Sequence, residues 1–366
     1  MLSLRAWRDF DFVLLGLVVL LLIFGVLMVR SATMGAIDPD LQNRVPRQIQ
    51  FGVVGLALIF GLAAIDYRLL GSIHTWIYGF VLGLLGLVAF LGVVGAAGAQ
   101  RWLNVGIAVQ PSELAKVLLI ITLGQYLSKR YEQMGRLGTL TGSIAYMAIP
   151  AGLIFLQPDL SGAIVLMVIW FSMVWGAGLR LHHIGLFLVI VLVLAPLIWG
   201  AMEEYQRGRI IQFINPGADK DAQYNIDQAL IAIGSGGLMG KGYTDGTQSQ
   251  LRFLRVRHTD FIFSVIAEEL GFVGALSVVV LFGLLLWRIL RAARLARDAL
   301  GSLICYGVAG VIFFQTVVSV GMNLGMIPVT GLTLPFISSG VSSLLTMMIG
   351  IGLVQSVIVR HRKLEF

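Results

Sequence analysis

Asp260 is the side chain of this 366-residue chain whose position best suits chemistry. It lies in the run His258-Thr-Asp-Phe-Ile-Phe263, immediately before a long apolar segment. A carboxylate at the edge of a membrane, beside a histidine, could accept a proton from a sugar hydroxyl. Capping of the next helix is the alternative for Asp260, and His258 alone is weaker evidence. Glu268 and Glu269, two turns deeper, are expected to satisfy polar groups inside a bundle.

Three further charged side chains occupy positions where charge is costly. Glu113 and Lys116 are one helical turn apart in Gln110-Pro-Ser-Glu-Leu-Ala-Lys116, so they can pair with each other. Such a pair is about as often a structural clamp as part of a catalytic site. Asp159, in Gln157-Pro-Asp159, is expected at the level of the lipid headgroups, where it either serves the site or caps the next helix.

Other polar segments are predicted on the same side of the membrane. Arg101 and Trp102 form one of them, with an interfacial anchor as the alternative for the tryptophan. The stretch 327–340 contains Ser338 and Ser339, and non-helical backbone at such depth is tolerated only when it is buried in protein or lines a cavity. An enzyme acting on a lipid headgroup needs one wet cavity at one interface, whereas a transporter needs groups reachable from both sides. The asymmetry favours the enzyme.

Three other chemistries find no support in the residue pattern. A Ser-His-Asp hydrolase would need a Gly-x-Ser-x-Gly elbow, which the sequence lacks. The glycine-rich stretch 234–242 fits neither the Walker A loop nor the dinucleotide-binding pattern, so we expect a flexible turn there. Cys305 is the sole cysteine, which excludes an intrachain disulfide or a cysteine cluster for a metal, and no metal site is predicted.

Composition places these residues in a membrane. Apolar residues make up 58% of the chain and charged residues 12%, against about 25% in ordinary soluble domains. The first apolar run follows Arg5 and Arg8 but is too long for a signal peptide and precedes no cleavage site, so we expect it to remain as a span. Ten runs are long enough to cross a bilayer, and they cover 12–29, 51–65, 75–95, 113–127, 140–156, 160–177, 184–201, 261–287, 301–325 and 341–359.

Basic residues set the expected orientation. With the N-terminus inside, the inside segments hold fourteen Lys and Arg residues and the short outside loops hold four, so both termini are predicted to be cytoplasmic. The pI of 9.7 therefore reflects topology and contact with anionic membrane lipids rather than binding of nucleic acid. The expected fold is an all-α polytopic membrane protein with about ten transmembrane helices in a single domain over 1–366.

One large extracytoplasmic loop, about 202–260, is expected between the seventh and eighth spans. It carries 14 charges in 59 positions, or about 24%, unlike its surroundings. Ile226, Leu230 and Ile233 recur at helical spacing, which predicts an amphipathic helix on the membrane or on the other spans. Solvated side chains are one interpretation of Arg207 and Arg209 in this loop.

Together these segments resemble the SEDS family of shape, elongation, division and sporulation proteins, polytopic enzymes that polymerise lipid II into peptidoglycan. The likeness covers nearly the whole chain. Its motifs, in order, are Gly98-Ala-Gln-Arg-Trp-Leu103, Gln110-Pro-Ser-Glu-Leu-Ala-Lys116, Gln157-Pro-Asp159, Tyr205-Gln-Arg207, Ala232-Ile-Gly-Ser-Gly-Gly237, Gly246-Thr-Gln-Ser-Gln-Leu251, His258-Thr-Asp-Phe-Ile-Phe263, Ala267-Glu-Glu-Leu-Gly271 and Leu334-Pro-Phe336. The Gly-Thr-Gln-Ser-Gln run resembles the RodA branch, which acts in cell elongation.

The resemblance implies a reaction at the outer face of the bacterial cytoplasmic membrane. The 4-hydroxyl of one lipid II disaccharide attacks the anomeric carbon of a growing chain and displaces undecaprenyl diphosphate with inversion. Asp260 matches the family's essential catalytic aspartate and is expected to be the general base. Trp102 matches a functionally important tryptophan, and the polar residues of the central cavity are matched by Glu113, Lys116 and Asp159.

The rest of the expected site follows from this reaction. The diphosphates need positive charge beside them, and the cationic candidates are Lys116, Arg101, Arg207 and Arg209. His258, Ser338 and Ser339 complete the expected substrate-binding set. A divalent cation, Mg²⁺ or Mn²⁺, could assist the leaving group.

Two positions depart from the family pattern. Leu254-Arg-Val256 stands where the family usually has Leu-Pro-Glu, which alters the charge and stiffness of the approach to Asp260. Gly340-Val-Ser342 replaces the usual Gly-Gly-Ser and bears on the backbone shape of the Ser-rich loop. Neither touches the His-Thr-Asp motif.

Two other functions remain as alternatives. A lipid II flippase would need ionisable groups along a path across the membrane, and none stands in the inner halves of the predicted spans. A non-catalytic scaffold of the wall-synthesis complex would tolerate the loss of the Asp260 carboxylate. The resemblance also implies a partner, a class B penicillin-binding protein that crosslinks the new strands.

Overall fold

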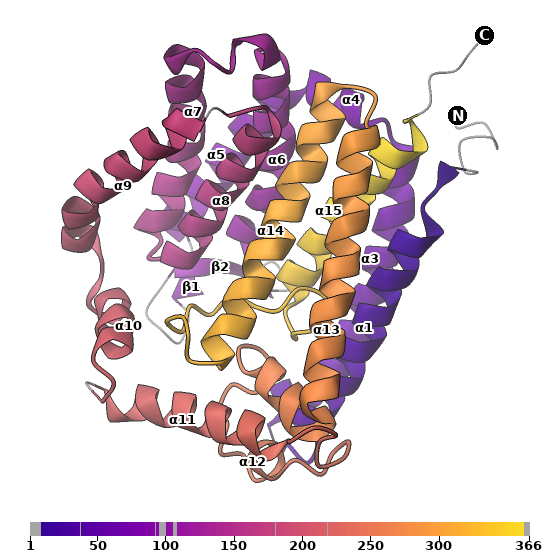
Figure 1. The fold of residues 1–366 in the computed structure, drawn as a ribbon, viewed down its shortest axis with the longest axis vertical. Coiled ribbons are helices and arrows are strands. Elements are labelled where there is room, and N and C mark those ends of the chain that lie inside the picture. The colour runs from indigo at the N-terminus through magenta and orange to yellow at the C-terminus, as the bar shows by residue number, and fades with distance from the viewer. Residues whose placement is uncertain are drawn as a thin grey trace.

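A computed structural model of the chain describes residues 9–36, 38–91, 93–94, 100–104, 108–179, 181–217 and 219–361. Its long elements are helices, most of them packed side by side in a bundle (Figure 1). Every predicted apolar run contains a helix, and these helices are α1 (Phe12–Thr33), α3 (Arg44–Ala64), α5 (His74–Leu91), α6 (Pro111–Ser128), α7 (Leu137–Leu156), α8 (Leu160–Gly176), α9 (Leu181–Ala201), α13 (Ile262–Leu295), α14 (Ala299–Asn323) and α15 (Val341–Val359).

Some of these helices are long enough to span a membrane. Within the described ranges, six helical stretches are long and apolar enough to cross a membrane: Phe12–Thr33, Pro39–Ala64, Leu137–Leu156, Ile262–Leu295, Ala299–Asn323 and Val341–Val359. Three shorter apolar helices, His74–Phe90, Leu160–Gly176 and Leu192–Ala201, accompany them. The chain is therefore a multi-pass membrane protein, and the count of ten spans stays a prediction.

The remaining elements are short. The helices among them are α2 (Pro39–Gln42), α4 (Tyr67–Ser72), α10 (Glu204–Ile214), α11 (Lys220–Ser235), α12 (Thr247–Gln250) and the 3-10 turn Tyr131–Gln133. Three strands, β1 (Val93–Val94), β2 (Gln100–Asn104) and β3 (Ala108–Val109), pair antiparallel in the order β1-β2-β3. The predicted all-α class is thus confirmed for the bundle, and this small sheet between α5 and α6 was not predicted.

The bundle core lies around α6, α14 and α15. Helix α14 packs against α6, α8, α13 and α15, while α15 also packs along α3. Large side chains of the continuous core are almost fully buried, among them Leu119 of α6, Trp170 of α8 and Phe282 of α13. Gly25 of α1 allows one close approach, because a Cβ at this position would lie 2.6 Å from Cα of Ile337. The stretch 327–340 is therefore held against α1.

Both described ends of the chain lie at the same end of the bundle (Figure 1). Asp11, just before α1, forms an ion pair with Arg288 of α13 at 2.7 Å, and its backbone N–H donates to Gln355 of α15. Helices α11 and α12 lie at the opposite end (Figure 1). This arrangement agrees with two termini on one side and the loop 202–260 on the other, although the orientation relative to the membrane stays a prediction.

The loop 202–260 is folded onto the bundle. Helix α11 confirms the predicted helix around Ile226 and Leu230, and it packs on α13 and α14. Its fully buried positions include Ala229 and Ala232, while Leu230 remains exposed. The glycine turn predicted over 234–242 begins only at 236, because Gly234 and Ser235 form the last residues of α11.

Two adjacent acids of α13 hold this loop in place. Glu268 accepts hydrogen bonds from the backbone N–H groups of Gln248 and Ser249 at the start of α12, and from Nζ of Lys241 at 3.1 Å. Glu269 accepts a hydrogen bond from the hydroxyl of Ser31 in α1. Both acids thus satisfy polar groups inside the protein, as the sequence predicted.

Helix α13 is broken at Gly271, where φ is 68° and ψ is −165°. Gly240 of the glycine turn, with φ of 80°, packs onto this break, and a Cβ there would lie 2.1 Å from the carbonyl oxygen of Glu269. Only glycine combines a positive φ with so close an approach of two backbones. The glycine turn is therefore a docking contact between the loop and α13, and not a nucleotide-binding loop.

Candidate functional site

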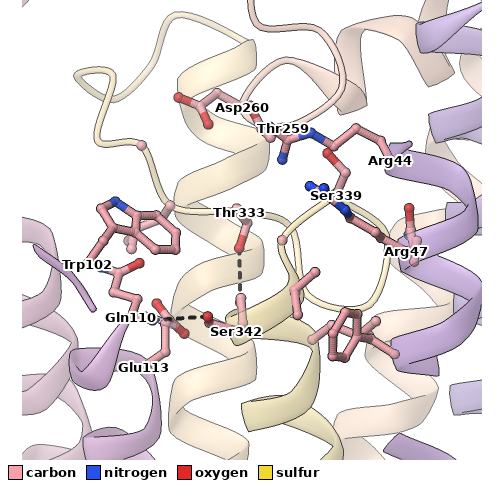
Figure 2. A pocket seen from close by; sticks show the side chains of 18 of the residues that line it. Arg44, Arg47, Trp102, Gln110, Glu113, Thr259, Asp260, Thr333, Ser339 and Ser342 are labelled. Atoms are coloured by element: carbon pink, nitrogen blue, oxygen red, sulfur yellow. Dashed lines mark hydrogen bonds between the residues drawn. The ribbon is translucent and has the colours of Figure 1, made fainter. Parts of the chain in front are cut away.

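A polar cavity of about 820 Å³ opens at the end of the bundle that faces α11 and α12. Helices α3, α6, α8 and α15 all begin at its wall, so the positive ends of four helix dipoles converge on it. Figure 2 shows its principal side chains. The polar and charged lining residues are Asp40, Arg44, Arg47, Gln48, Gln50, Gln110, Glu113, Asp159, Ser161, Thr259, Asp260, Thr330, Thr333, Ser339, Ser342 and Ser343, with Trp102 at one side.

Asp260 is placed at this cavity by the turn that leads into α13. The side chain of Asn323 donates to the backbone carbonyl of Asp260 at 2.8 Å, and it accepts from the backbone N–H and the hydroxyl of Ser264. Phe261, and not Asp260, is the N-cap of α13, without a side-chain cap bond. The capping alternative for Asp260 is therefore wrong, and its carboxylate is left to face the cavity.

The surroundings of Asp260 favour a base. Burial raises the pKa of its carboxyl above the ordinary 3.8, while the Thr259 hydroxyl and the charge of Arg209 act in the opposite direction. Gly331, with φ of 74°, lies between Asp260 and Arg209, because a Cβ there would be 3.9 Å from Asp260 Oδ2 and 3.8 Å from Arg209 Nη1. A carboxylate with a raised pKa takes up a proton more readily than an exposed one.

His258 and Thr259 are fixed through their backbones. The hydroxyl of Ser338 donates to the carbonyl of Thr259 at 2.8 Å, and the hydroxyl of Ser339 donates to the carbonyl of His258 at 3.0 Å. Burial lowers the pKa of His258 to about 4, with the charges of Arg44 and Arg257 adding to the effect. The imidazole is therefore neutral at physiological pH. The predicted Ser338 and Ser339 hold the Asp260 turn, and Ser339 also reaches the cavity wall.

Glu113 and Lys116 form the predicted pair at the start of α6. Lys116 Nζ donates to Glu113 Oε1 at 2.6 Å, and the lysine side chain is 1% exposed. Glu113 lines the cavity, and its buried Oε2 has no hydrogen-bond partner among the described residues, whereas Lys116 lies behind the wall. Asp159 caps α8 by accepting the backbone N–H of Gly162 at 3.0 Å, which confirms the capping prediction, and it also lines the cavity.

The other predicted cations are spread around the site. Arg207 donates to the backbone carbonyls of Trp199 and Gly200 at the end of α9, while Arg209 stacks over Tyr205 in α10 beside Asp260. Trp102 is 38% exposed and lines the cavity. The side chain of Arg101 lies outside the described part of the structure.

The structure adds residues that the sequence did not predict. Arg44 and Arg47 of α3 reach into the cavity, although from the sequence they were placed only among the four basic residues of the short outside loops. Ser342 accepts the backbone N–H of Gln110 at 3.1 Å and thereby joins α15 to α6 (Figure 2). The spacing of the two arginines, three residues apart at the start of an apolar run, was the signal that could have revealed them.

The two departures from the family pattern are accommodated. Val341 is the first residue of α15 and has no positive φ, so its backbone does not require glycine. Leu254 is fully buried, and Arg255 forms an exposed ion pair with Asp221 at 3.5 Å. Neither change alters the hydrogen bonds of the Asp260 turn described above.

A metal site of protein groups alone does not occur in the described ranges, since these contain no cluster of three or more His, Cys, Asp or Glu side chains that could hold an ion. Magnesium commonly uses one or two carboxylates together with substrate phosphates. The buried Oε2 of Glu113 at the cavity wall, which accepts no hydrogen bond from the part of the chain that the structure describes, is one protein oxygen that suits this mode. The expected divalent cation thus stays a prediction.

Bundle and cavity together define a multi-pass membrane protein with a polar site at one end of its helices. The chain belongs to the FtsW, RodA and SpoVE family of cell cycle proteins, whose model matches residues 12–363. This family is the one that the sequence motifs resembled.

Individual relatives resemble the chain over nearly its whole length. The peptidoglycan glycosyltransferase MrdB of Escherichia coli K12 is 36% identical over 357 residues, which are 97% of this chain and 94% of MrdB. The crystal structure of the rod shape determining protein RodA of Thermus thermophilus matches with a TM-score of 0.72 and 34% identity, over 96% and 97% of the two chains.

A second solved structure comes from work on a peptidoglycan synthase complex that coordinates polymerisation and crosslinking. It matches with a TM-score of 0.81 and 34% identity, over 96% of this chain and 98% of that one.

Proposed function

We infer that the chain is a peptidoglycan glycosyltransferase that polymerises lipid II during cell elongation. The observation that carries this function is Asp260, a carboxylate with a raised pKa that lines a cavity where four helices begin. The fold and family are those of relatives named as peptidoglycan glycosyltransferases. A cavity of this size and polarity at one end of the bundle suits a disaccharide carried on a lipid diphosphate.

Asp260 acts as the general base of the reaction. It removes the proton from the 4-hydroxyl of the acceptor disaccharide while that oxygen attacks the anomeric carbon of the growing chain. The bond to the leaving diphosphate breaks on the opposite face, so the α-linked donor gives a β-linked product. Arg209 stands beside the base, and its positive charge favours the ionised form of the carboxylate. His258, already neutral, cannot supply positive charge, so its contribution to the substrate is that of a neutral hydrogen-bonding group.

The remaining predicted residues divide into two roles. Glu113, Asp159 and Trp102 meet the sugar and peptide directly, because they line the cavity. Lys116, Ser338 and Ser339 position other residues of the site. Lys116 fixes Glu113, and the two serines fix the turn that carries Asp260. Arg101 and Arg207 remain candidates for contacts with charged groups at the outer rim. A divalent cation bound through the substrate diphosphate would neutralise the leaving group.

The cellular setting is part of the same proposal. The chain is a single domain, 1–366, that crosses the bacterial cytoplasmic membrane ten times, with both termini in the cytoplasm and the loop 202–260 outside. This orientation puts the cavity at the outer leaflet, where lipid II is polymerised. The partner is a class B penicillin-binding protein, and support comes from the similar chain in a peptidoglycan synthase complex.

Glycan synthesis from purified lipid II tests this function. The full chain is reconstituted in liposomes with a cognate class B partner whose transpeptidase is inactivated, and Asp260→Asn is compared with wild type. Loss of a general base costs about 10²–10⁴-fold in rate, so the variant should form no detectable long strands. Asp227→Ala, which removes an exposed carboxylate of α11, is the matched control and should retain full activity.

The alternatives predict different outcomes. A scaffold would support wall synthesis by its partners equally well with Asp260→Asn. A flippase would move a fluorescent lipid II analogue across liposomes without forming strands. Absence of strands from wild type, with an active partner complex present, would contradict the polymerase function.

A further inference from the structure

Two arginines of the cavity have no part in the chemistry described so far. Arg44 and Arg47 lie three residues apart in the first turn of α3, so their side chains share one face of the helix. Both line the cavity, and Figure 2 shows them reaching from α3 toward Ser339 and Thr259. Two guanidinium groups are therefore presented together on one wall.

Their hydrogen-bond donors are largely available. Nε of Arg44 is buried and has no partner among the described residues. Arg47 has an ion pair with Asp40 at 3.9 Å, but the two side chains are 51% and 73% exposed. An exposed pair of this length contributes little, so a stronger anion can replace Asp40.

Positive and negative side chains lie on different sides of the cavity. Carboxylates enter from the other helices: Glu113 from α6, Asp159 from the start of α8 and Asp260 from the turn before α13. These groups repel an anion and attract hydroxyl and amide donors. The arginines of α3 attract the anion, and a guanidinium binds phosphate oxygens through two parallel hydrogen bonds.

We propose that Arg44 and Arg47 bind the diphosphate of the polyprenyl-linked substrate, with the sugar extending toward the carboxylates of α6 and α8. This assignment rests on the proposed function for the identity of the substrate. The diphosphate site is thereby assigned to α3 instead of Lys116. The side chain of Lys116 is buried behind the cavity wall, where it pairs with Glu113. Asp260 lines the same cavity, where the sugar reacts.

Binding of undecaprenyl diphosphate, which carries no sugar, tests the subsite without turnover. The full chain in nanodiscs is titrated with this lipid, and the dissociation constant is compared for wild type, Arg44→Gln, Arg47→Gln and the double variant. We expect each single change to weaken binding about tenfold or more, because it removes charge-assisted hydrogen bonds. Arg44→Lys and Arg47→Lys keep the charge but lose the planar fork, so they should fall between wild type and the Gln variants.

Matched controls separate recognition from folding. Arg30→Gln removes an exposed arginine near the end of α1, outside the residues that line the cavity, and should leave the affinity unchanged. Undecaprenol, which lacks the diphosphate, should bind all variants with equal affinity. Unchanged affinity for undecaprenyl diphosphate in the double variant would overturn the proposal. So would an equal loss of undecaprenol binding, because the arginines would then support the fold.

Steady-state glycan synthesis distinguishes the two diphosphates of the reaction. If the arginines hold the leaving diphosphate of the growing chain, the Gln variants lower kcat while KM for lipid II is unchanged. If they hold the diphosphate of the acceptor, KM rises and kcat is unchanged. Both outcomes support the subsite and assign its occupant. Should wild type form no strands at all, the proposed function fails, while arginine-dependent binding of undecaprenyl diphosphate would still establish the subsite.

Discussion

Replacing Lys116 by methionine should destabilise the protein severely. Lys116 Nζ and Glu113 Oε1 are 2.6 Å apart, and the two side chains are 1% and 12% exposed. Methionine fills similar volume but leaves the Glu113 carboxylate without its partner, and the other oxygen of this carboxylate has no partner within the described ranges. Breaking a buried pair from one side costs about 3–5 kcal/mol. The ratio of unfolded to folded protein should rise by between about a hundredfold and several thousandfold.

The double variant Glu113→Gln/Lys116→Met separates a structural pair from a substrate contact. It removes both charges together, so no uncompensated carboxylate remains, and most of the lost stability should return. The assay is the midpoint of thermal unfolding of the purified chain in detergent, measured for wild type, both single variants and the double variant. Binding of undecaprenyl diphosphate is measured on the same four proteins.

One pattern would refute this reasoning. If Lys116→Met kept the wild-type midpoint but lost affinity for undecaprenyl diphosphate, the lysine would be a ligand of the anion and not a support for Glu113. Failure of the double variant to regain stability would equally show that the two side chains do not act as a pair.

Three further predictions follow from described positions. Because burial raises the pKa of Asp260, a pH–rate profile of glycan synthesis should fall with decreasing pH at a midpoint above 3.8. His258→Gln should leave this midpoint unchanged, since His258, with a pKa of about 4, is already neutral at physiological pH. Gly240→Ala should lower the thermal midpoint by several degrees and reduce activity, because the added Cβ would lie 2.1 Å from a carbonyl oxygen of α13, whereas Gly234→Ala meets nothing within 4 Å and should be neutral or mildly stabilising. Val341→Gly should lower stability by about 0.5–1 kcal/mol in thermal unfolding, because glycine at a helical position loses more backbone entropy, with no change in glycan length.

Local signals in the sequence predicted the helices and the local pairs. Apolar runs of sufficient length gave the long helices, because burial in lipid or protein requires them regardless of neighbours. The i, i+3 spacing of Glu113 and Lys116 predicted their contact, and the position of Asp159 after a proline predicted a cap. Each of these features depends on residues within one turn of the chain.

The assembly of the cavity depends on contacts between distant segments, which spacing alone does not encode. Arg44 and Arg47 became part of the site because α3 packs along α15. The sequence likewise assigned Lys116 to the substrate, since nothing in its spacing shows which face of α6 is covered. The side chains of Ser338 and Ser339 were expected to meet substrate, but both donate to backbone carbonyls next to Asp260.

The hydrogen bonds of Ser338 and Ser339 also determine which positions near Asp260 tolerate substitution. The acceptors are the main-chain carbonyls of His258 and Thr259, which every amino acid possesses. The two serine hydrogen bonds therefore persist when the side chain of residue 258 or 259 is replaced, so long as the new side chain fits the available space. A library of substitutions at positions 258 and 259 should yield mostly folded proteins, whereas substitutions at 338 and 339 should lower stability, because each removes a hydrogen bond to the Asp260 turn. The main-chain path of the turn that carries Asp260 is thus fixed by residues 338 and 339, whereas at residues 258 and 259 only the side chains are open to change.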